Sequence, residues 1–308
     1  MRASDNAKLV VWRLYDGKPG HDRQSAGLVR ALAAATALEE CVFDIRNCHV
    51  SVGDYFFKRL PFAVGAPDPD LIIGAGRRCQ WPLVAARRAR PARTVYLMKP
   101  LLPKRCFDLC LIPRHDGPTA SPRVIITDGV LNDVPVRTSN ANDGLVLIGG
   151  PSEHYGWDPL SLKTQIKDII DAAPEKKWVI ADSRRTPPDT IAALECLFRD
   201  NVTLMPCYRS APDRLRVQFE QSDLVWVTRD SVSMIYEALT AGAAVGVLEI
   251  PAKRKDRITS MVDDLAARGM VTPYAAWRAG TEPQAGPPLA EAARCAAIIL
   301  TRMHNKEP

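Results

Sequence analysis

The sequence has no apolar run that approaches the ~20 residues needed to cross a bilayer as a helix. Its first residues, MRASDNAK, lead straight into an apolar strand pattern, without the charged and then apolar stretches of a secretory signal. We therefore expect a protein that is made and kept in the cytoplasm.

Motifs of three common functional classes are also missing. The eight cysteines lie at irregular spacing and form no C-x-x-C pair, so we expect small buried thiols and no bound metal. The absence of a G-x-x-G-x-x-G turn and of a Tyr-x-x-x-Lys pair argues against an epimerase of the short-chain dehydrogenase type. The sequence also lacks an aromatic RNA-binding signature, and we expect no nucleic acid partner.

What is present is an ordinary globular composition with an uneven charge. The 308 residues are enough for two domains of about 150 residues each. The formal charge is +6, and nine basic residues but no acid lie between Leu71 and Phe107. This block is either a solvated face or a surface that binds an anionic membrane.

The first half of the chain repeats a unit of strand, Gly-rich or polar loop, and helix. Apolar segments at 8–14, 40–46, 70–73, 93–98, 109–113 and 124–126 predict a mainly parallel sheet in a doubly wound domain. Ligands of such sheets bind beyond the carboxyl ends of the strands. The candidate acceptor-side loop residues there are Gly17, Lys18, Gly20, Arg77, Lys99 and His115, and the candidate catalytic bases are His21 and Asp116. For His21, a surface or capping histidine is the alternative.

The segment Ser51 to Val64 is unusually aromatic and carries Lys58 and Arg59. It is either part of the core or an amphipathic loop or short helix that inserts its phenylalanines into a bilayer surface, namely Phe56, Phe57 and Phe62.

A polar, turn-rich segment, Asn132 to Asp143, predicts an interdomain linker. We expect a first domain at 1–135, a second at 144–288 and a closing helix at 289–308. In the second domain, Gly149, Gly150 and Ser152 follow one predicted strand, and Arg184 and Arg185 follow the next. Paired guanidiniums at a strand end suit bidentate binding of an anion, although adjacent arginines also occur as plain surface charge.

The stretch Ser222 to Pro251 reads as strand, tight loop, helix and strand. Ser231 is the predicted N-cap of the helix at 232–241, whose free amides and positive dipole end suit a diphosphate. Glu237 is the only acid on this helix. It either takes part in the ligand site or is a solvated helix residue.

This stretch resembles the signature of the GT-B glycosyltransferases, especially the peptidoglycan N-acetylglucosaminyltransferase. The resemblance rests on Asp230, Ser231, Val232, Ser233, Glu237, Ala241 and Gly242. It implies that Asp230, Ser231 and Ser233 belong to a loop that binds a nucleotide diphosphate, and that Glu237 binds the ribose hydroxyls. It also implies a last helix that crosses back to the first domain. The chain has Ser231 where those enzymes have glycine.

Across the whole chain, the motifs DGKPGHDRQ, GAGRR, LIGGPS, SRRTP and VTRDSVSMIYEA resemble the Elm-type mitochondrial fission family and its bacterial relatives. Plant members recruit a division dynamin, and the bacterial branch has been labelled a nucleoside-diphosphate-sugar epimerase. The resemblance implies a metal-independent GT-B glycosyltransferase with a nucleotide-sugar co-substrate, no cofactor and a membrane-associated acceptor, located peripherally on the inner face of the membrane. The alternatives are a non-catalytic membrane or partner adaptor and a GT-B-fold epimerase.

Overall fold

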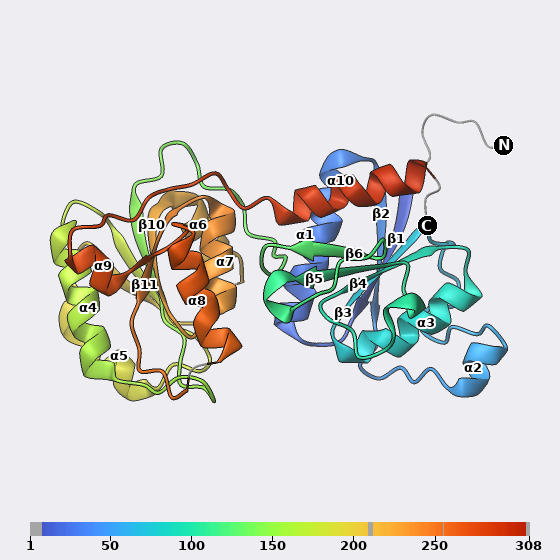
Figure 1. Ribbon diagram of the computed structural model, residues 1–308, viewed down its shortest axis with the longest axis horizontal. Coiled ribbons are helices and arrows are strands. Elements are labelled where there is room, and N and C mark those ends of the chain that lie inside the picture. The colour runs from blue at the N-terminus through green and yellow to red at the C-terminus, as the bar shows by residue number, and fades with distance from the viewer. Residues whose placement is uncertain (1–7, 209–211, 255, 306–308) are drawn as a thin grey trace. The chain divides into compact units, whose positions relative to one another are not determined.

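The chain divides into two compact units, residues 1–133 with 290–308, and residues 134–289. The computed structural model describes residues 8–208, 212–254 and 256–305. Each unit is built on a six-stranded sheet with helices on both of its faces (Figure 1). Among the described helices, none is long and apolar enough to cross a membrane.

The first unit has a parallel sheet in the order β2-β1-β3-β4-β5-β6. Three short 3-10 turns follow its strands, namely η1 (Arg77–Cys79), η2 (Lys104–Cys106) and η3 (Arg114–Asp116). Its helices and strands are, in chain order, β1 (Leu9–Tyr15), α1 (Pro19–Ala35), β2 (Leu38–Asp44), α2 (Val52–Phe56), β3 (Leu71–Ala75), α3 (Gln80–Ala89), β4 (Arg93–Leu97), β5 (Leu109–Pro113), β6 (Val124–Thr127) and α10 (Glu291–His304).

Both faces of this sheet are apolar because successive strand side chains point to opposite sides and helices cover both. Val11 of β1 packs on one side with Leu28 of α1 and Ile299 of α10. Trp12 packs on the other side, with Leu83 of α3. The last helix of the chain therefore completes the core of the first unit.

The second unit also has a parallel sheet, in the order β12-β11-β10-β7-β8-β9. Its elements are β7 (Asp143–Leu147), α4 (Pro159–Ala172), β8 (Trp178–Ala181), α5 (Pro188–Leu194), β9 (Val202–Met205), α6 (Pro212–Gln221), β10 (Ser222–Thr228), α7 (Val232–Ala241), β11 (Ala244–Leu248), α8 (Arg257–Ala267), β12 (Thr272–Pro273) and α9 (Tyr274–Arg278).

Two tryptophans fill the core of the second sheet next to glycines on neighbouring strands. Trp178 of β8 lies beside Gly144 of β7, and Trp226 of β10 lies beside Gly246 of β11. A side chain at either glycine would collide with the indole ring. The strand glycines are therefore needed for packing rather than for turns.

The predicted GT-B-like architecture of two doubly wound units, with a last helix in the first unit, is confirmed. The first helix begins at Pro19, because proline is well suited to a first helical position. Of the two alternatives for the segment Ser51 to Val64, the core holds for Phe62, whose ring packs edge-on against Trp12, whereas Phe56 and Phe57 are exposed.

Candidate functional site

The second sheet has a topological switch point between β7 and β10. The chain runs outward from β7 to β8 and β9, then returns to β10 on the other side of β7. Loops that leave such a pair of strands diverge and open a crevice at their carboxyl ends. A pocket of about 260 Å³ lies there, lined by Ser152, His154, Tyr155, Arg185, Asp230, Ser231, Val232 and Ser233.

Helix α7 begins at this pocket. Ser231 occupies the predicted N-cap position, and its side chain makes no capping hydrogen bond. The first-turn amides and the positive end of the helix dipole therefore face the pocket without a capping oxygen. This is the arrangement in which helices bind anions.

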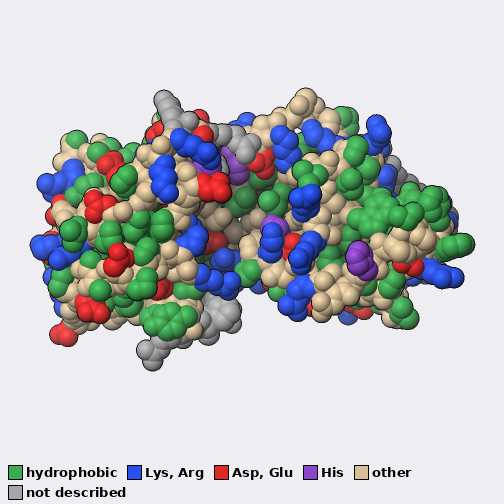
Figure 2. All heavy atoms as spheres, turned by 90° about the horizontal axis from the view of Figure 1, so that it is seen from below, with side chains coloured by type: hydrophobic (Ala, Val, Ile, Leu, Met, Phe, Trp, Pro, Cys, Tyr) green, Lys and Arg blue, Asp and Glu red, His purple; other side chains and the backbone are tan. Residues whose placement is uncertain are grey.

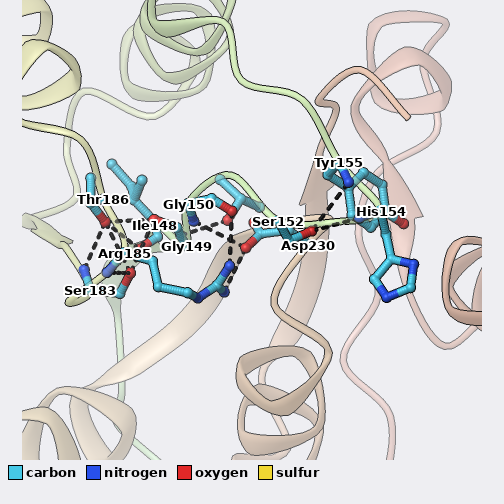
Figure 3. Close-up of polar contacts among 11 residues, drawn as sticks. Ile148, Gly149, Gly150, Ser152, His154, Tyr155, Ser183, Arg185, Thr186 and Asp230 are labelled. Atoms are coloured by element: carbon cyan, nitrogen blue, oxygen red, sulfur yellow. Dashed lines mark hydrogen bonds and ion pairs between the residues drawn. The ribbon is translucent and has the colours of Figure 1, made fainter. Parts of the chain in front are cut away.

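An ion pair between Arg185 and Asp230 forms the floor of the site (Figure 3). The guanidinium lies 2.7 Å from Asp230 Oδ2 and donates a second bond of 2.9 Å to the Gly150 carbonyl. Asp230 Oδ2 also accepts a bond from the Gly150 amide. Asp230 Oδ1 is buried and has no hydrogen-bond partner. A ligand donor is one way to satisfy such an oxygen.

The glycine pair after β7 is required by this packing. A Cβ on Gly149 would collide with the Asp230 carboxylate, and a Cβ on Gly150 would collide with the Arg185 backbone. The loop after β8 is tied to the same glycines, because the Ser183 and Thr186 hydroxyls bond the Gly149 carbonyl. The loops after β7, β8 and β10 therefore form one hydrogen-bonded cluster.

Ser152 and Tyr155 form another wall of the pocket. The Ser152 Oγ atom accepts bonds from the amides of His154 and Tyr155, which leaves its hydrogen for a ligand. Burial raises the pKa of the Tyr155 phenol, so this side chain stays protonated at neutral pH.

His154 is a pocket residue that the sequence analysis missed. Its Nδ1 atom lies 2.6 Å from Asp256 Oδ2, and Arg254 bonds the same carboxylate oxygen at 2.9 Å. A histidine soon after a Gly-Gly strand end is a weak signal. Asp256 lies 102 residues further along the chain, so no spacing rule could have joined the two.

Two other predicted diphosphate-site residues do not line this pocket. Arg184 is exposed, one residue before Arg185. Glu237 lies in α7 and is 4% exposed, so the alternative of a solvated helix residue is wrong. A carboxylate so deeply buried needs polar partners.

The first unit has its own switch point, between β1 and β3, and a histidine lies there too. His21 Nδ1, in the first turn of α1, lies 2.9 Å from Asp16 Oδ2. The Asp16 side chain is 1% exposed, and its other oxygen accepts a bond from the Lys18 amide. Asp16 was missed by the sequence analysis, although its place directly after a buried strand was a usable signal.

Two glycines let the chain close around this histidine. Gly17 and Gly76 have φ of +86° and +85°, which side-chain-bearing residues rarely adopt. A Cβ on Gly76 would collide with the His21 ring. Gly20 differs from the expectation of a loop glycine, since it lies in α1 with open space around it.

The remaining acceptor-side candidates lie at other strand ends. Lys99, after β4, donates a 3.0 Å bond to the carbonyl of Asp116 in η3, next to His115. Arg77 is exposed in η1. In the sheet, β3 and β4 separate β1 from β5, so the strands that precede His21 and Asp116 lie three strand spacings apart, about 14 Å at the usual spacing.

Within the described residues, no group of three or more His, Cys, Asp or Glu side chains could hold a metal ion. The side chains of the two sites suit anion binding at the start of α7 and proton transfer at two carboxylate-held histidines.

Comparison with solved structures shows the fold. A UDP-N-acetylglucosamine 2-epimerase is 15% identical, with 97% of each chain covered and a TM-score of 0.60. The corresponding enzyme of Methanocaldococcus jannaschii is 9% identical over 96% of this chain and 100% of its own, with a TM-score of 0.56. That of Neisseria meningitidis, solved with UDP-GlcNAc bound, is 12% identical over 98% and 100%, with a TM-score of 0.52.

These likenesses establish the GT-B fold. No curated protein sequence matches the chain. A model of the mitochondrial fission ELM1 family matches residues 19–303. Because this match covers most of the sequence, the chain belongs to the mitochondrial fission ELM1 family.

Proposed function

We propose that the protein is a GT-B glycosyltransferase that binds a nucleoside-diphosphate sugar through its second unit, without a bound metal or cofactor. The observation that carries the proposal is the pocket at the β7/β10 switch point, where the start of α7 lies beside Arg185. Helix-start amides and guanidinium groups both bind phosphate oxygens.

In the proposed complex, the first-turn amides of α7 and the Ser233 hydroxyl donate to the diphosphate. Arg185 has five N–H donors, and its bonds to Gly150 and Asp230 leave others for a phosphate oxygen. Asp230 fixes the direction of the guanidinium. Glu237 accepts hydrogen bonds from the vicinal hydroxyls of the ribose.

Each histidine has a separate role in this proposal. With Nδ1–H donated to Asp16, the Nε2 atom of His21 accepts the proton of the attacking hydroxyl. The new bond forms at the anomeric carbon as its bond to the diphosphate oxygen breaks. His154, oriented by Asp256, donates a hydrogen bond to the departing diphosphate. His21 is preferred to Asp116 as base because a buried carboxylate fixes its tautomer.

A nucleoside-diphosphate-sugar 2-epimerase is the second candidate, because solved epimerases share the fold over nearly the whole chain. In an elimination route to the C2 epimer, the bond between the anomeric carbon and the diphosphate oxygen also breaks, so the same pocket would serve it. The difference lies at C2, where epimerisation exchanges a proton with solvent and transfer does not.

Calorimetric titration with uridine, guanosine, adenosine and cytidine diphosphates tests the binding proposal. We expect one nucleotide to bind and His21→Ala to leave its affinity unchanged. A chain that binds none of them is the adaptor that the sequence analysis kept as an alternative, and the proposal then fails.

The sugar derivative of the nucleotide that binds then separates transfer from epimerisation. The enzyme and this sugar nucleotide are incubated in D₂O, and NMR follows the reaction. We expect the diphosphate to be released only when an acceptor is present, and we propose that this acceptor is presented at a membrane. Asp16→Asn should slow release about 10²-fold to 10⁴-fold, the usual contribution of a positioned base. Deuterium at C2 without net release of the diphosphate would identify the epimerase instead.

A further inference from the structure

Helix α2 presents aromatic side chains to solvent in the first unit. Phe56 and Phe57 are 63% and 72% exposed, and they are the exposed phenylalanines of the described residues. Val52 and Val64, on the same segment, are also exposed. Figure 2 shows hydrophobic side chains gathered over α2 with Lys and Arg side chains around them. Exposed apolar area of this kind commonly marks an interaction site.

Both ends of α2 are fixed, so the exposure of the two phenylalanines is built in. Ser51 and Asp54 form a capping box at its start. At its end, the Arg59 amide bonds the Asp54 carbonyl at 2.8 Å, and Lys58 adopts a left-handed φ of +57°. Glycine is the usual residue at this position. The chain instead places a cation there, directly after the aromatic tip.

Further cations surround this tip. The Arg59 guanidinium lies 5.4 Å from the centre of the Phe57 ring, and that of Arg88 lies 4.9 Å from the centre of the Tyr55 ring. Lys58, Arg59 and Arg88 are all exposed. Asp54 is the one acid in the segment 51–64, and its Oδ2 atom accepts the capping bonds.

A pocket of about 380 Å³ adjoins α2. Trp81 lines it and also packs against Tyr55, with ring centres 5.3 Å apart. Its polar lining includes Arg46, held by Asp44, and the exposed side chains of His49 and Arg78. Tryptophan and tyrosine favour the headgroup level of a bilayer, and arginine binds phosphate.

We propose that α2 docks on an anionic phospholipid bilayer, with Phe56 and Phe57 in the acyl boundary and the adjoining pocket around a headgroup phosphate. Apolar projections ringed by cations bind membranes in this way, and charge selects the anionic lipid. The surface does not depend on the proposed transfer reaction, because it shares no residue with the α7 pocket.

Co-sedimentation of the full chain with vesicles tests the proposal. We expect binding to an equal mixture of phosphatidylcholine and phosphatidylglycerol, and much weaker binding to phosphatidylcholine alone. The double variant Phe56→Ser, Phe57→Ser should bind about a hundredfold more weakly, which corresponds to about 1.4 kcal/mol for each ring. Lys58→Gly keeps the left-handed turn, loses one charge and should bind severalfold more weakly.

Tyr208→Ser serves as the matched control, since Tyr208 is an exposed aromatic residue of the second unit and its loss should change nothing. Nucleotide titration of every variant keeps this test separate from that of the proposed function. Equal sedimentation of wild type and the double phenylalanine variant would overturn the proposal. So would a wild-type dimer that the double variant turns into a monomer, since a second copy would then cover α2.

Discussion

The Asp230 carboxylate is completely buried and lies 2.7 Å from an Arg185 guanidinium that is nearly half exposed. Asp230 is thus part of the interior, while the Arg185 guanidinium remains open to a ligand. This asymmetry separates a structural from a binding role within one ion pair.

We expect Arg185→Ala to lower nucleotide affinity about tenfold to a hundredfold, because hydrogen bonds to charged groups contribute about 1.5–3 kcal/mol. The free energy of unfolding should also fall by about 1–3 kcal/mol, since Asp230 is left buried without its cation. Calorimetry and chemical denaturation measure the two effects. Adding Asp230→Asn should restore part of the stability but not the affinity, and recovery of both would contradict the assigned roles.

Gly149→Ala should lower stability by about 1–3 kcal/mol, as overpacking usually does, and should abolish nucleotide binding. The added methyl would meet a carboxylate that the Arg185 and Gly150 bonds hold in place. Gly20→Ala is the matched control, because that glycine lies in a helix with open space beside it. It should be neutral or stabilising by about 0.5–1 kcal/mol in thermal unfolding.

Glu237→Gln should weaken nucleotide binding about tenfold, because an amide offers one acceptor oxygen to two ribose hydroxyls. Glutamine is chosen over alanine since Glu237 is buried, and truncation would leave a cavity as well as remove the charge. Calorimetric titration of the wild type and of Glu237→Gln with the nucleotide measures this difference in affinity. Equal affinities would remove Glu237 from the ribose site.

Three buried thiols should make the protein less stable in alkali. Burial raises the pKa of Cys79, Cys110 and Cys295 to about 12. In the unfolded chain these thiols ionise at about pH 8.5. Above that pH the unfolded state binds fewer protons than the folded state, so it gains stability relative to the folded state. The stability is fully present below about pH 8.5 and is lost toward about pH 12, at up to about 1.4 kcal/mol per pH unit per thiol.

Denaturant unfolding across this alkaline range measures the loss. Cys295→Ala should reduce the slope of stability against pH, whereas Cys196→Ala, at an exposed position, should leave it unchanged. A slope that is the same in all three proteins would count against ionisation of Cys295 as a cause.

The six strands of the first unit were predicted to within about two residues because each is an apolar run closed by a turn, and such runs are local signals. The loop after β10 was found for the same reason. The N-cap position of Ser231 was also predicted correctly, but the absence of a side-chain capping bond was not foreseen, because residue type does not fix the rotamer that a cap requires. The two-residue strand β12 of the second unit was not predicted.

The charged pairs that define the sites were outside the reach of sequence patterns. Arg185 and Asp230 are 45 residues apart, and His154 and Asp256 are 102 apart. Only the order of the strands brings them together. Asp16 and His21 are close in sequence, but a turn between strand and helix has no fixed period that would reveal their contact.

The place of α10 in the first unit reverses the usual order of completion during synthesis. Domains commonly fold in the order in which they leave the ribosome. Here Cys295, Ala296 and Ile299 cover the face of α1 that carries Leu28 and Leu32, and they are translated after the whole second unit. The core of the first unit therefore stays partly open during synthesis until α10 has been made, after the whole second unit.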